Sequence, residues 1–328
     1  MGQSEFANVI SPEVIESSIG NSWANELALV KYAPQVFVKD SRPITQGTLV
    51  SAVRNTFFQG ESGQAIGAGQ DISSVGRVQS KENHPVIWRY GSIDENDVIA
   101  EIAPKDVAGA MDVNAQYAQA GTEAGAQWLE DSLVSMIEGV AGALTSNQAG
   151  SGATATLANL IEGKAALADQ GLNLNGGAAI MRSELYWMLT ALGAIAQASN
   201  TFSGQAADEI LRTGMLPANF LGGYAFPMDK LAAAPGTDHY LYFIGAQSIV
   251  LRAYSAPELE FARKTALKQF GWVMNLKFKF AAGFKGVSWN AAGSDKLSDL
   301  DLSTSANWTL ADSASKYVRI ARVLTDNN

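Results

Sequence analysis

The residue types that usually carry catalysis or bind metals are scarce in this chain. It has two histidines, His84 and His239, and no cysteine. Zinc sites need three or four ligands, drawn mostly from His and Cys side chains. The lack of cysteine also excludes disulfides and thiol nucleophiles. We therefore expect no metal site at either histidine, and we interpret each as an ordinary strand or loop residue.

One acidic cluster, formed by Asp94, Glu95 and Asp97, has oxygen ligands that a cation could use. It lacks the regular ligand spacing and the closing Glu of a calcium-binding loop. We therefore predict a solvated acidic turn at the end of a strand within 83–98, and no metal.

Stretches that resemble phosphate-binding or catalytic motifs are all incomplete. Gly67 and Gly69 begin like a dinucleotide-binding fingerprint, but Ile stands in the place of the third glycine. Gly163 precedes a lysine, yet the Ser or Thr and the earlier Gly of a phosphate-binding loop are missing. Ser313 and Lys316 match Ser-x-x-Lys without its companion motifs. We expect no catalytic residue, no cofactor and no enzyme activity.

The composition predicts a surface that other protein subunits cover. Of the 328 residues, 47% are apolar and 17% are charged, against about 25% charged in ordinary soluble domains. No apolar run approaches the roughly 20 residues of a membrane-spanning helix, and the N-terminus lacks the pattern of a signal peptide. We therefore expect a cytosolic origin and no membrane contact. Because charge is depleted at the cores of protein interfaces, the low charge indicates extensive subunit contacts.

The net charge of −9 argues against a protein that reads DNA sequence. Binding through phosphates needs clustered Lys and Arg, whereas the 23 basic residues of this chain are scattered. The densest group, from Lys264 to Lys285, alternates with apolar residues, which is typical of a solvated strand face. We expect any contact with DNA to be independent of its sequence.

Residues 258–282 have the period-two pattern of β-strands. Apolar side chains occupy every second position of the later half, at Trp272, Met274, Leu276, Phe278 and Phe280. Successive strand side chains point to opposite faces, so this ribbon has one buried and one solvated face. We predict a long antiparallel hairpin that turns near Gly271. The alternative is a first arm that begins as a helix, because Ser255 and Glu258 fit a capping box.

A long helix is predicted over 106–144. Gly109, Gly121, Gly125 and Gly139 weaken it, so a bend or break is a possible alternative. The Gly- and Ser-rich stretch 145–156 is predicted to be a flexible connection. The apolar residues of the helix recur at steps of mostly three and four, at Val113, Tyr117, Ala120, Ala124, Trp128, Leu129, Leu133, Met136, Ile137, Val140 and Leu144.

Two segments near the N-terminus lack apolar cover of their own. Residues 1–38 hold a short amphipathic piece from Val14 to Leu27 that cannot bury its apolar face alone. Residues 39–82 are predicted to form an extended hairpin with a Gly-rich tip. A two-stranded hairpin is marginal in water, so this one needs a surface to lie on.

The remaining region mixes helices and strands. Within 157–235 we predict one helix over 179–198 and a shorter one over 206–211. Residues 237–254 are predicted to form a strand, a turn and a second strand. The polar tail contains one further strand candidate, 317–324.

Six stretches in a fixed order carry a family resemblance. They resemble the major capsid proteins of tailed bacteriophages, the Hong-Kong-phage-type capsid fold that encapsulins share. The resemblance covers residues 6–290 and leaves the tail beyond it unassigned. The stretches are "FANVISPEVIESSIGNSW", the hairpin 39–82, the helix 106–144, "IMRSELYWMLTALGAI", "YLYFIGAQSIVLRAY" and "FGWVMNLKFKFAAGFKGVSWN".

The resemblance implies an α+β phage major capsid fold in which the spine helix covers one face of the long hairpin. It also implies that the N-terminal arm and the extended loop lie on neighbouring subunits. The implied parts are an N-terminal arm (1–38), an extended β-hairpin loop with its return strand (39–90), a peripheral domain with the spine helix and the long hairpin (91–147 and 253–293), an axial domain (148–252) and a C-terminal tail (294–328).

The function implied is that of a major capsid protein whose hexamers and pentamers form an icosahedral shell around double-stranded DNA. The implied partners are further copies of itself, a portal protein, a scaffolding protein, decoration proteins and packaged DNA bound without sequence specificity. The implied location is the virion, assembled in the bacterial cytoplasm. The candidate assembly residues are Trp23, Phe57, Phe58, Gly60, Gly63, Ile66, Gly67, Gly69 and Arg77.

Two other functions stay open on the sequence alone. An encapsulin-like compartment of a cell has the same fold with a different interior. An unrelated α+β enzyme or ligand-binding protein is expected to be a monomer or small oligomer with a polar pocket.

Overall fold

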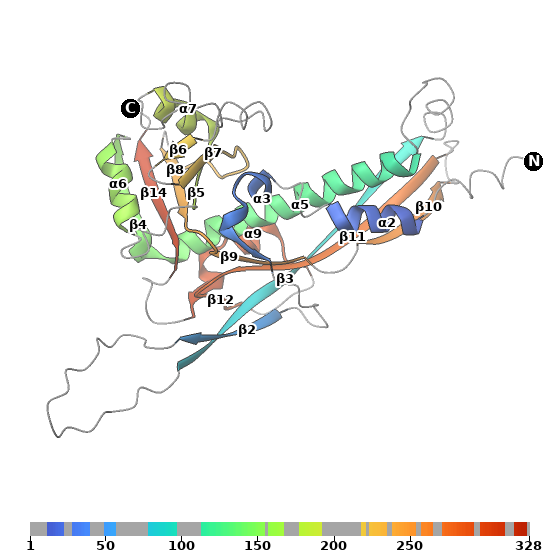
Figure 1. Ribbon diagram of the computed structural model, residues 1–328, viewed down its shortest axis with the longest axis horizontal. Helices are drawn as coiled ribbons and strands as arrows, with labels where there is room; N and C mark the ends of the chain where they lie inside the picture. The colour runs from blue at the N-terminus through green and yellow to red at the C-terminus, as the bar shows by residue number, and fades with distance from the viewer. Residues whose placement is uncertain are drawn as a thin grey trace, which may run out of the picture.

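Two six-stranded sheets and one long helix organise the described part of the chain (Figure 1). Sheet I runs beside the helix, and sheet II lies in a lobe at one end of it. The computed structural model describes residues 12–22, 28–39, 49–56, 78–96, 113–154, 157–166, 177–191, 218–220, 223–234, 238–253, 257–264, 271–291, 296–311 and 318–326.

Sheet I contains the two longest strands, and both are antiparallel to their main neighbours. The central strand β11 pairs with β3 from Gly271 to Ala281, with β10 over its first half and with β9 from Phe280 to Phe284. The strand order is β1 (Phe37–Lys39), β9 (Ile249–Ala253), β11 (Gly271–Phe284), β3 (Val78–Asn96) and β2 (Leu49–Thr56), with β10 (Glu258–Lys264) beside β11.

The predicted hairpin over 258–282 is confirmed. Strands β10 and β11 are antiparallel, in a register that runs from Glu258 opposite Lys277 to Lys264 opposite Gly271. The helical alternative for the first arm is wrong, because all seven residues of β10 pair with β11. These pairs outweigh the local capping-box pattern of Ser255 and Glu258.

The alternating pattern of β11 separates two environments. Met274, Leu276, Phe278 and Phe280 are buried, whereas the lysines between them stay partly exposed. The buried side chains pack against helix α5 (Val113–Ala143), where Trp128 meets Phe278 edge to face at a centroid distance of 5.7 Å. The spine helix predicted over 106–144 is thus confirmed over 113–143.

Helix α5 is continuous through 31 residues, so the alternative of a bend or break is wrong at Gly121, Gly125 and Gly139, whereas Gly109 lies outside the described residues. The glycines instead permit close packing. A Cβ at Gly121 would collide with Ile19, one at Gly125 would collide with the Phe278 ring, and one at Gly139 would collide with the carbonyl oxygen of Leu302. Three neighbouring elements approach the helix at these points.

The N-terminal segment packs partly on its own chain. Helix α2 (Pro12–Ser22) lies on α5 and β10 and buries Ile15 and Ile19 completely, while Val14 is 59% exposed. Helix α5 thus supplies apolar cover for 12–22, and contact of the arm with neighbouring subunits stays a prediction. Helix α3 (Ala28–Tyr32) and the 3₁₀ turn η2 (Pro34–Val36) continue this packing toward β1.

Sheet II corrects two predictions about secondary structure. The stretch predicted as a flexible connection contains strand β4, and the start of the helix predicted over 179–198 is strand β5, followed by α7 (Ser183–Ala191). The helix predicted over 206–211 lies outside the described residues. The strand order is β4 (Gln148–Thr154), β14 (Ile320–Asp326), β8 (His239–Ile244), β5 (Ala178–Met181), β7 (Gly223–Pro227) and β6 (Ala218–Phe220).

The strand, turn and strand predicted over 237–254 are confirmed, but the two strands belong to different sheets. Strand β8 lies in sheet II and β9 lies in sheet I. Their turn contains Gln247, which has a positive φ of 54° and donates its backbone N–H to Gln35. This short turn is therefore a direct covalent link between the two sheets.

The C-terminal residues are built into both halves of the molecule. Strand β14, predicted over 317–324, pairs with β4 on one side and β8 on the other. Before it, helix α9 (Asp299–Ser303) and the 3₁₀ turn η6 (Ser305–Asn307) lie against α5, and strand β13 (Trp308–Leu310) pairs with β12 (Val287–Trp289). Within this two-stranded sheet the rings of Trp289 and Trp308 meet edge to face at a centroid distance of 4.8 Å.

Candidate assembly surfaces

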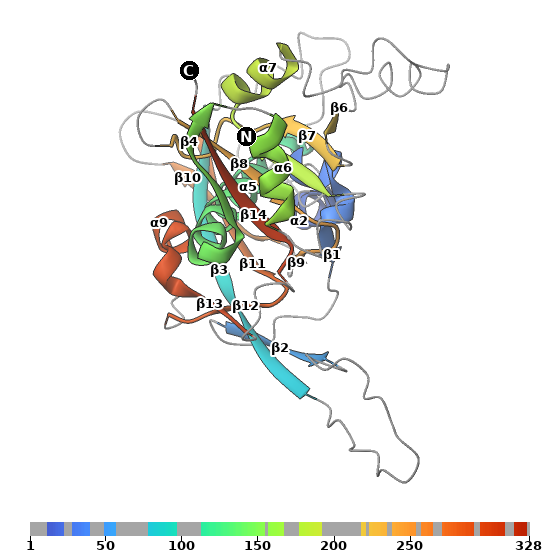
Figure 2. The ribbon, with the colours of Figure 1, turned by 90° about the vertical axis from the view of Figure 1, so that its left-hand side faces the viewer.

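The β2–β3 arm is the part of the described structure that departs furthest from the two lobes. Strand β3 pairs with β11 from Asn96 back to Val86, and from Pro85 to Val78 it pairs with β2 instead. Figure 2 shows β2 and the first part of β3 projecting beyond the other labelled elements. The two arms of the hairpin predicted within 39–82 are confirmed, and residues 57–77 between them lie outside the described residues.

The predicted assembly residues cannot be compared with this geometry. Trp23 falls between α2 and α3, outside the described residues, and the others fall between the two arms of the hairpin. Their role stays a prediction. The set outside the described residues is Trp23, Phe57, Phe58, Gly60, Gly63, Ile66, Gly67, Gly69 and Arg77.

The root of the arm holds a buried polar pair. Glu82 is 3% exposed and His84 is 4% exposed, and the His84 Nε2 atom lies 3.8 Å from a carboxylate oxygen of Glu82. The other Glu82 oxygen accepts a hydrogen bond from the backbone N–H of Gly286 at 2.8 Å. The sequence predicts His84 as a strand residue, which is confirmed, but not its acidic neighbour two positions earlier on the same strand face.

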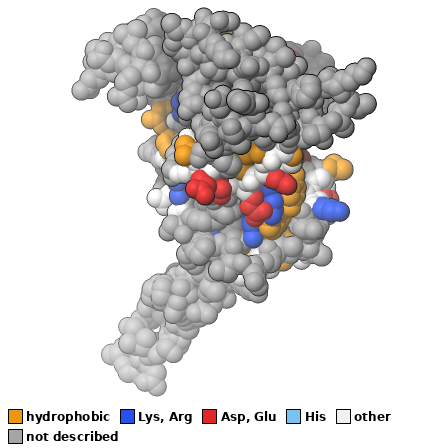
Figure 3. Space-filling view, turned by 90° about the vertical axis from the view of Figure 1, so that its right-hand side faces the viewer, with side chains coloured by type: hydrophobic (Ala, Val, Ile, Leu, Met, Phe, Trp, Pro, Cys, Tyr) orange, Lys and Arg blue, Asp and Glu red, His pale blue; other side chains and the backbone are white. Residues whose placement is uncertain are grey.

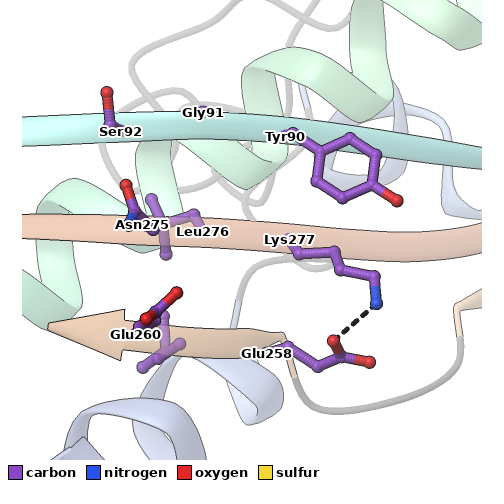
Figure 4. Close-up of a pocket in the computed structure, with 9 residues that line it drawn as sticks. Tyr90, Gly91, Ser92, Glu258, Glu260, Asn275, Leu276 and Lys277 are labelled. Atoms are coloured by element: carbon purple, nitrogen blue, oxygen red, sulfur yellow. Dashed lines mark hydrogen bonds and ion pairs between the residues drawn. The ribbon is translucent and has the colours of Figure 1, made fainter.

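The solvent face of sheet I carries an open groove of about 620 Å³. In Figure 4, Tyr90, Lys277 and Glu258 form one row across β3, β11 and β10, and the Lys277 Nζ lies 2.5 Å from Glu258. Tyr90 is 63% exposed. Ser92, Asn275 and Glu260 line the groove in the next row, together with Gly91, Leu259 and Leu276.

Aromatic rings and lysines adjoin this groove. Trp88 stacks on Tyr90 at a centroid distance of 6.5 Å, and the Nζ atoms of Lys277 and Lys279 lie 4.8 and 4.6 Å from the Trp88 ring. Such cation–π contacts hold both lysines against the sheet. On the described part of the face in Figure 3, acidic and basic side chains lie next to each other, with hydrophobic side chains beside them. Because acidic and basic side chains alternate here, this described part of the face lacks the clustered positive charge that a phosphate backbone needs.

The predicted acidic turn at Asp94 and Glu95 is wrong. Both residues belong to β3, opposite Val273 and Trp272 of β11, because the long ladder extends β3 to Asn96. Asp97 lies outside the described residues. Among the residues that the structure describes, no three His, Asp or Glu side chains gather in a way that could hold a metal ion.

A short strap, residues 228–234, ties sheet II to helix α5. The Lys230 Nζ lies 2.7 Å from a carboxylate oxygen of Asp131 and 3.6 Å from one of Glu130. The backbone N–H of Ala232 donates to Glu138 at 2.5 Å. At the other side of the strap, Asp229 accepts hydrogen bonds from the side chain and from the backbone N–H of Ser183, and these bonds lower the pKa of the Asp229 carboxyl.

Glu138 lies at the centre of this junction. Burial raises the pKa of the Glu138 carboxyl, while the N–H of Ala232 and the charge of Arg322 oppose that rise. Burial likewise raises the pKa of the nearby Tyr242 hydroxyl, and the charge of Glu138 adds to the effect. The junction is therefore a partly desolvated contact in which the Glu138 carboxylate accepts one backbone hydrogen bond and is attracted by one cation.

None of the helices that the structure describes combines the length and the apolar composition needed to cross a membrane.

No protein-family model matches the chain, and no curated protein matches it. Solved structures do match. A chain in the capsid of cyanophage P-SCSP1u is 11% identical with a TM-score of 0.51, over 90% of this chain and 88% of that one. The cyanophage Pam1 capsid gives 11% identity and a TM-score of 0.52, over 92% and 93% of the two chains.

The protein has the tailed-phage capsid fold. The match extends to a chain of Mycobacterium phage Bobi, with 11% identity and a TM-score of 0.51 over 100% of this chain and 99% of that one. The fold here combines the long helix α5, the β10–β11 hairpin packed against it, the β2–β3 arm and the separate lobe of sheet II. The sequence resemblance to this fold is thus confirmed at the level of architecture.

Proposed function

We propose that this protein is a major capsid protein whose copies assemble, as hexamers and pentamers, into the icosahedral shell of a tailed bacteriophage that encloses double-stranded DNA. The observation that carries the proposal is the match to phage capsid structures over about nine-tenths or more of both chains. A fold alone does not define a function, so features of the surface must agree with it.

Three surface features support a subunit that is completed by its neighbours. The β2–β3 arm is a two-stranded projection, which is marginal when isolated. Tyr90 and Trp187, exposed by 63% and 60%, lie on opposite halves of the molecule, and aromatic side chains of this kind often dominate binding energy at interfaces. The low charged fraction of 17% is also typical of extensive contacts.

Rotational symmetry explains how one chain can use these features repeatedly. Rings of five or six copies need heterologous contacts that close by rotation. Many modest contacts per copy then give a stable shell through effective concentration. We assign the contact role to the segment 57–77 with Phe57, Phe58, Gly60, Gly63, Ile66, Gly67, Gly69 and Arg77, and to Trp23.

The division into domains is part of this proposal. A peripheral domain would comprise 91–147 and 253–293, and an axial domain would comprise 148–252. The separation of sheet I from sheet II supports this division. Further partners proposed on the same basis are a portal protein, a scaffolding protein and decoration proteins, with packaged DNA contacted without sequence specificity. The net charge of −9 agrees with that last point.

Deleting residues 58–70 tests the role of the arm tip. The variant is expected to keep the far-UV circular dichroism spectrum of the folded subunit and to form no stable shells in sedimentation and negative-stain microscopy. A matched variant replaces 58–70 by a Gly/Ser segment of equal length, which keeps the reach of the arm but removes Phe58 and Ile66. Normal assembly of both variants would show that the arm tip has no assembly role.

A further inference from the structure

The arm leaves the body at a sharp change of strand partners. Following β3 from the body toward the arm, Val86 is the last residue that pairs with β11, opposite Ala281. The next residue, Pro85, is the first that pairs with β2. Proline has no N–H and cannot donate to a strand ladder, which suits a point where a ladder ends. Beyond this point β2 is the only strand of the described residues in register with β3. A pivoting movement of the arm would therefore centre on residues 82–85.

Glu82 joins the arm to the turn between β11 and β12. Its carboxylate accepts the N–H of Gly286 at 2.8 Å, and its side chain is almost fully buried. Gly286 has a φ of 84°, a conformation that favours glycine, so the turn that presents this N–H has a defined shape. A buried carboxylate is costly unless it is hydrogen-bonded. The contact is therefore lost only at a considerable cost in free energy.

The two residues that follow Glu82 contact the same segment. The N–H of Asn83 donates to the Ser288 hydroxyl at 3.0 Å. The His84 ring occupies the space above Gly283, where an added Cβ would lie 2.6 Å from the ring Cγ. Three consecutive residues of β3 thus hold three positions of the segment 283–288 on the body.

We propose that Glu82, Asn83 and His84 form an arm clamp that fixes the angle between the β2–β3 arm and the body, with Glu82 as its main positioning residue. The functional meaning of the clamp rests on the proposed capsid function, in which the arm reaches a neighbouring copy. Holding the arm in one direction before assembly reduces the conformational entropy lost when copies associate. The clamp itself is a property of the free subunit.

Pulsed electron paramagnetic resonance on the free subunit measures the arm angle directly. The natural chain has no cysteine, so Thr56→Cys at the end of β2 and Leu300→Cys on α9, where Leu300 is 76% exposed, accept spin labels without background. The wild-type background is expected to give one narrow distance distribution. Glu82→Ala is expected to widen it at least roughly twofold, because the arm loses its main anchor.

Two matched variants separate the clamp from general damage to the arm. Glu82→Gln retains an oxygen that can accept the Gly286 N–H, so its distribution is expected to stay narrow. Ser51→Ala removes an exposed hydrogen bond between Ser51 and the Asn83 side chain at the same level of the arm. It is expected to leave the distribution unchanged, because exposed bonds contribute little.

Hydrogen exchange gives a second readout, since the Gly286 amide is itself the donor to Glu82. Its protection factor is expected to fall at least about tenfold in Glu82→Ala and to be largely restored in Glu82→Gln. If Glu82→Ala fails to fold, Gly283→Ala displaces His84 from the other side and is expected to widen the same distance distribution.

The outcomes separate this inference from the proposed function. Unchanged, narrow distributions in both Glu82→Ala and Gly283→Ala would overturn the clamp, whether or not the wild type forms shells. A wild type that never forms shells would overturn the capsid function, while a widened distribution in Glu82→Ala would still establish the clamp. Where the wild type assembles, Glu82→Ala is expected to give a lower yield of closed shells.

Discussion

Glycines in the middle of a helix usually lower its stability, but three glycines of α5 allow neighbouring elements to pack closely against the helix. At Gly139 the space for a Cβ is taken by the carbonyl oxygen of Leu302 and by the Trp308 ring, whose Nε1 would lie 2.7 Å away. The Trp308 Nε1–H donates to that same carbonyl at 2.8 Å. A backbone atom cannot move aside as a flexible side chain can, so this position excludes larger residues.

Gly139→Ala is therefore expected to destabilise the subunit, although alanine favours helix by about 1 kcal/mol over glycine. Overpacking against a backbone atom costs typically about 1–3 kcal/mol, so the net change in the free energy of unfolding is expected to be negative. Denaturant unfolding monitored by tryptophan fluorescence measures it. Gly142→Ala is the control, because its Cβ would meet only Ser305 closely, at 3.1 Å. Equal stability of the two variants would contradict this assignment.

Glu138 provides a pH-dependent test of the junction between α5 and the strap. Because burial raises the pKa of Glu138, the folded state binds its proton more tightly than the unfolded chain does. The stability that this carboxyl contributes is then complete below its unfolded pKa and is lost as pH rises through the folded pKa.

Glu138→Gln removes the titration and keeps an oxygen that can accept the Ala232 N–H. The stability of the variant relative to wild type is expected to increase from about pH 4 to about pH 7. Urea unfolding midpoints across this range measure the difference, and all other carboxyls cancel because both proteins share them. A difference that stays constant or declines with rising pH would contradict the burial of this carboxyl.

Among the helices and strands, the predictions that are confirmed rest on apolar patterns that repeat over many residues. The alternation from Met274 to Phe280 predicted β11, and the three- and four-residue steps predicted α5, because each pattern repeats over several turns or residues. The arms of the hairpin in 39–82 were also recognisable. Strand β11 and helix α5 each bury one continuous face, and this one-sided burial produces the periodic pattern.

The predictions that failed depend on partners far away in the sequence. Strand β4 is rich in Gly and Ser and resembles a linker, but β14, more than 150 residues later, provides its ladder. Residues 178–181 are apolar throughout, so their period could not distinguish strand from helix. Asp94 and Glu95 resemble a turn until β11 pairs with them. In the sequence, the buried pair is visible only as an acidic residue and a histidine two positions apart, Glu82 and His84. This spacing is too common in strands to predict a buried contact.

The C-terminal segment 296–311 is fastened to sheet I by one arginine. The Arg89 guanidinium donates to the carbonyl oxygens of Leu297, at 2.6 Å, and Trp88, at 3.1 Å, and pairs with Asp299. The Ser132 hydroxyl of α5 donates to the same carboxylate at 3.2 Å. This segment therefore depends on contacts with β3 and α5 as well as on its own helix α9.

Arg89→Ala is expected to increase local opening of 296–311 without unfolding the sheets. Loss of hydrogen bonds to a partly buried charged group corresponds to about 1–2 kcal/mol, so amide protection in this segment should fall roughly fivefold to thirtyfold. Hydrogen exchange with mass spectrometry reports it by peptide. Arg182→Ala, which removes a comparable bond to the Leu231 carbonyl in the other lobe, is the control. Unchanged protection of 296–311 in Arg89→Ala would refute the role of this arginine.

At the scale of the whole molecule, the structure confirms the tailed-phage capsid fold that the sequence resemblance implies. The order of the six stretches indicated the capsid fold before the architecture was known, although no single stretch could do so. The contacts between copies were not predictable in the same way, because they depend on surfaces that meet only in the assembly. The tail beyond residue 290 gave only the strand candidate 317–324, and its pairing with β4 and β8 in sheet II was not predictable, because both partners lie far away in the sequence.

Electron microscopy of the purified protein under assembly conditions tests the central claim most directly. The capsid function predicts closed icosahedral shells on the order of tens of nanometres across, built from rings of five and six copies. The β2–β3 arm of each copy is expected to contact its neighbour. A single monomer species in sedimentation under every assembly condition, with no closed particle in the images, would contradict the account.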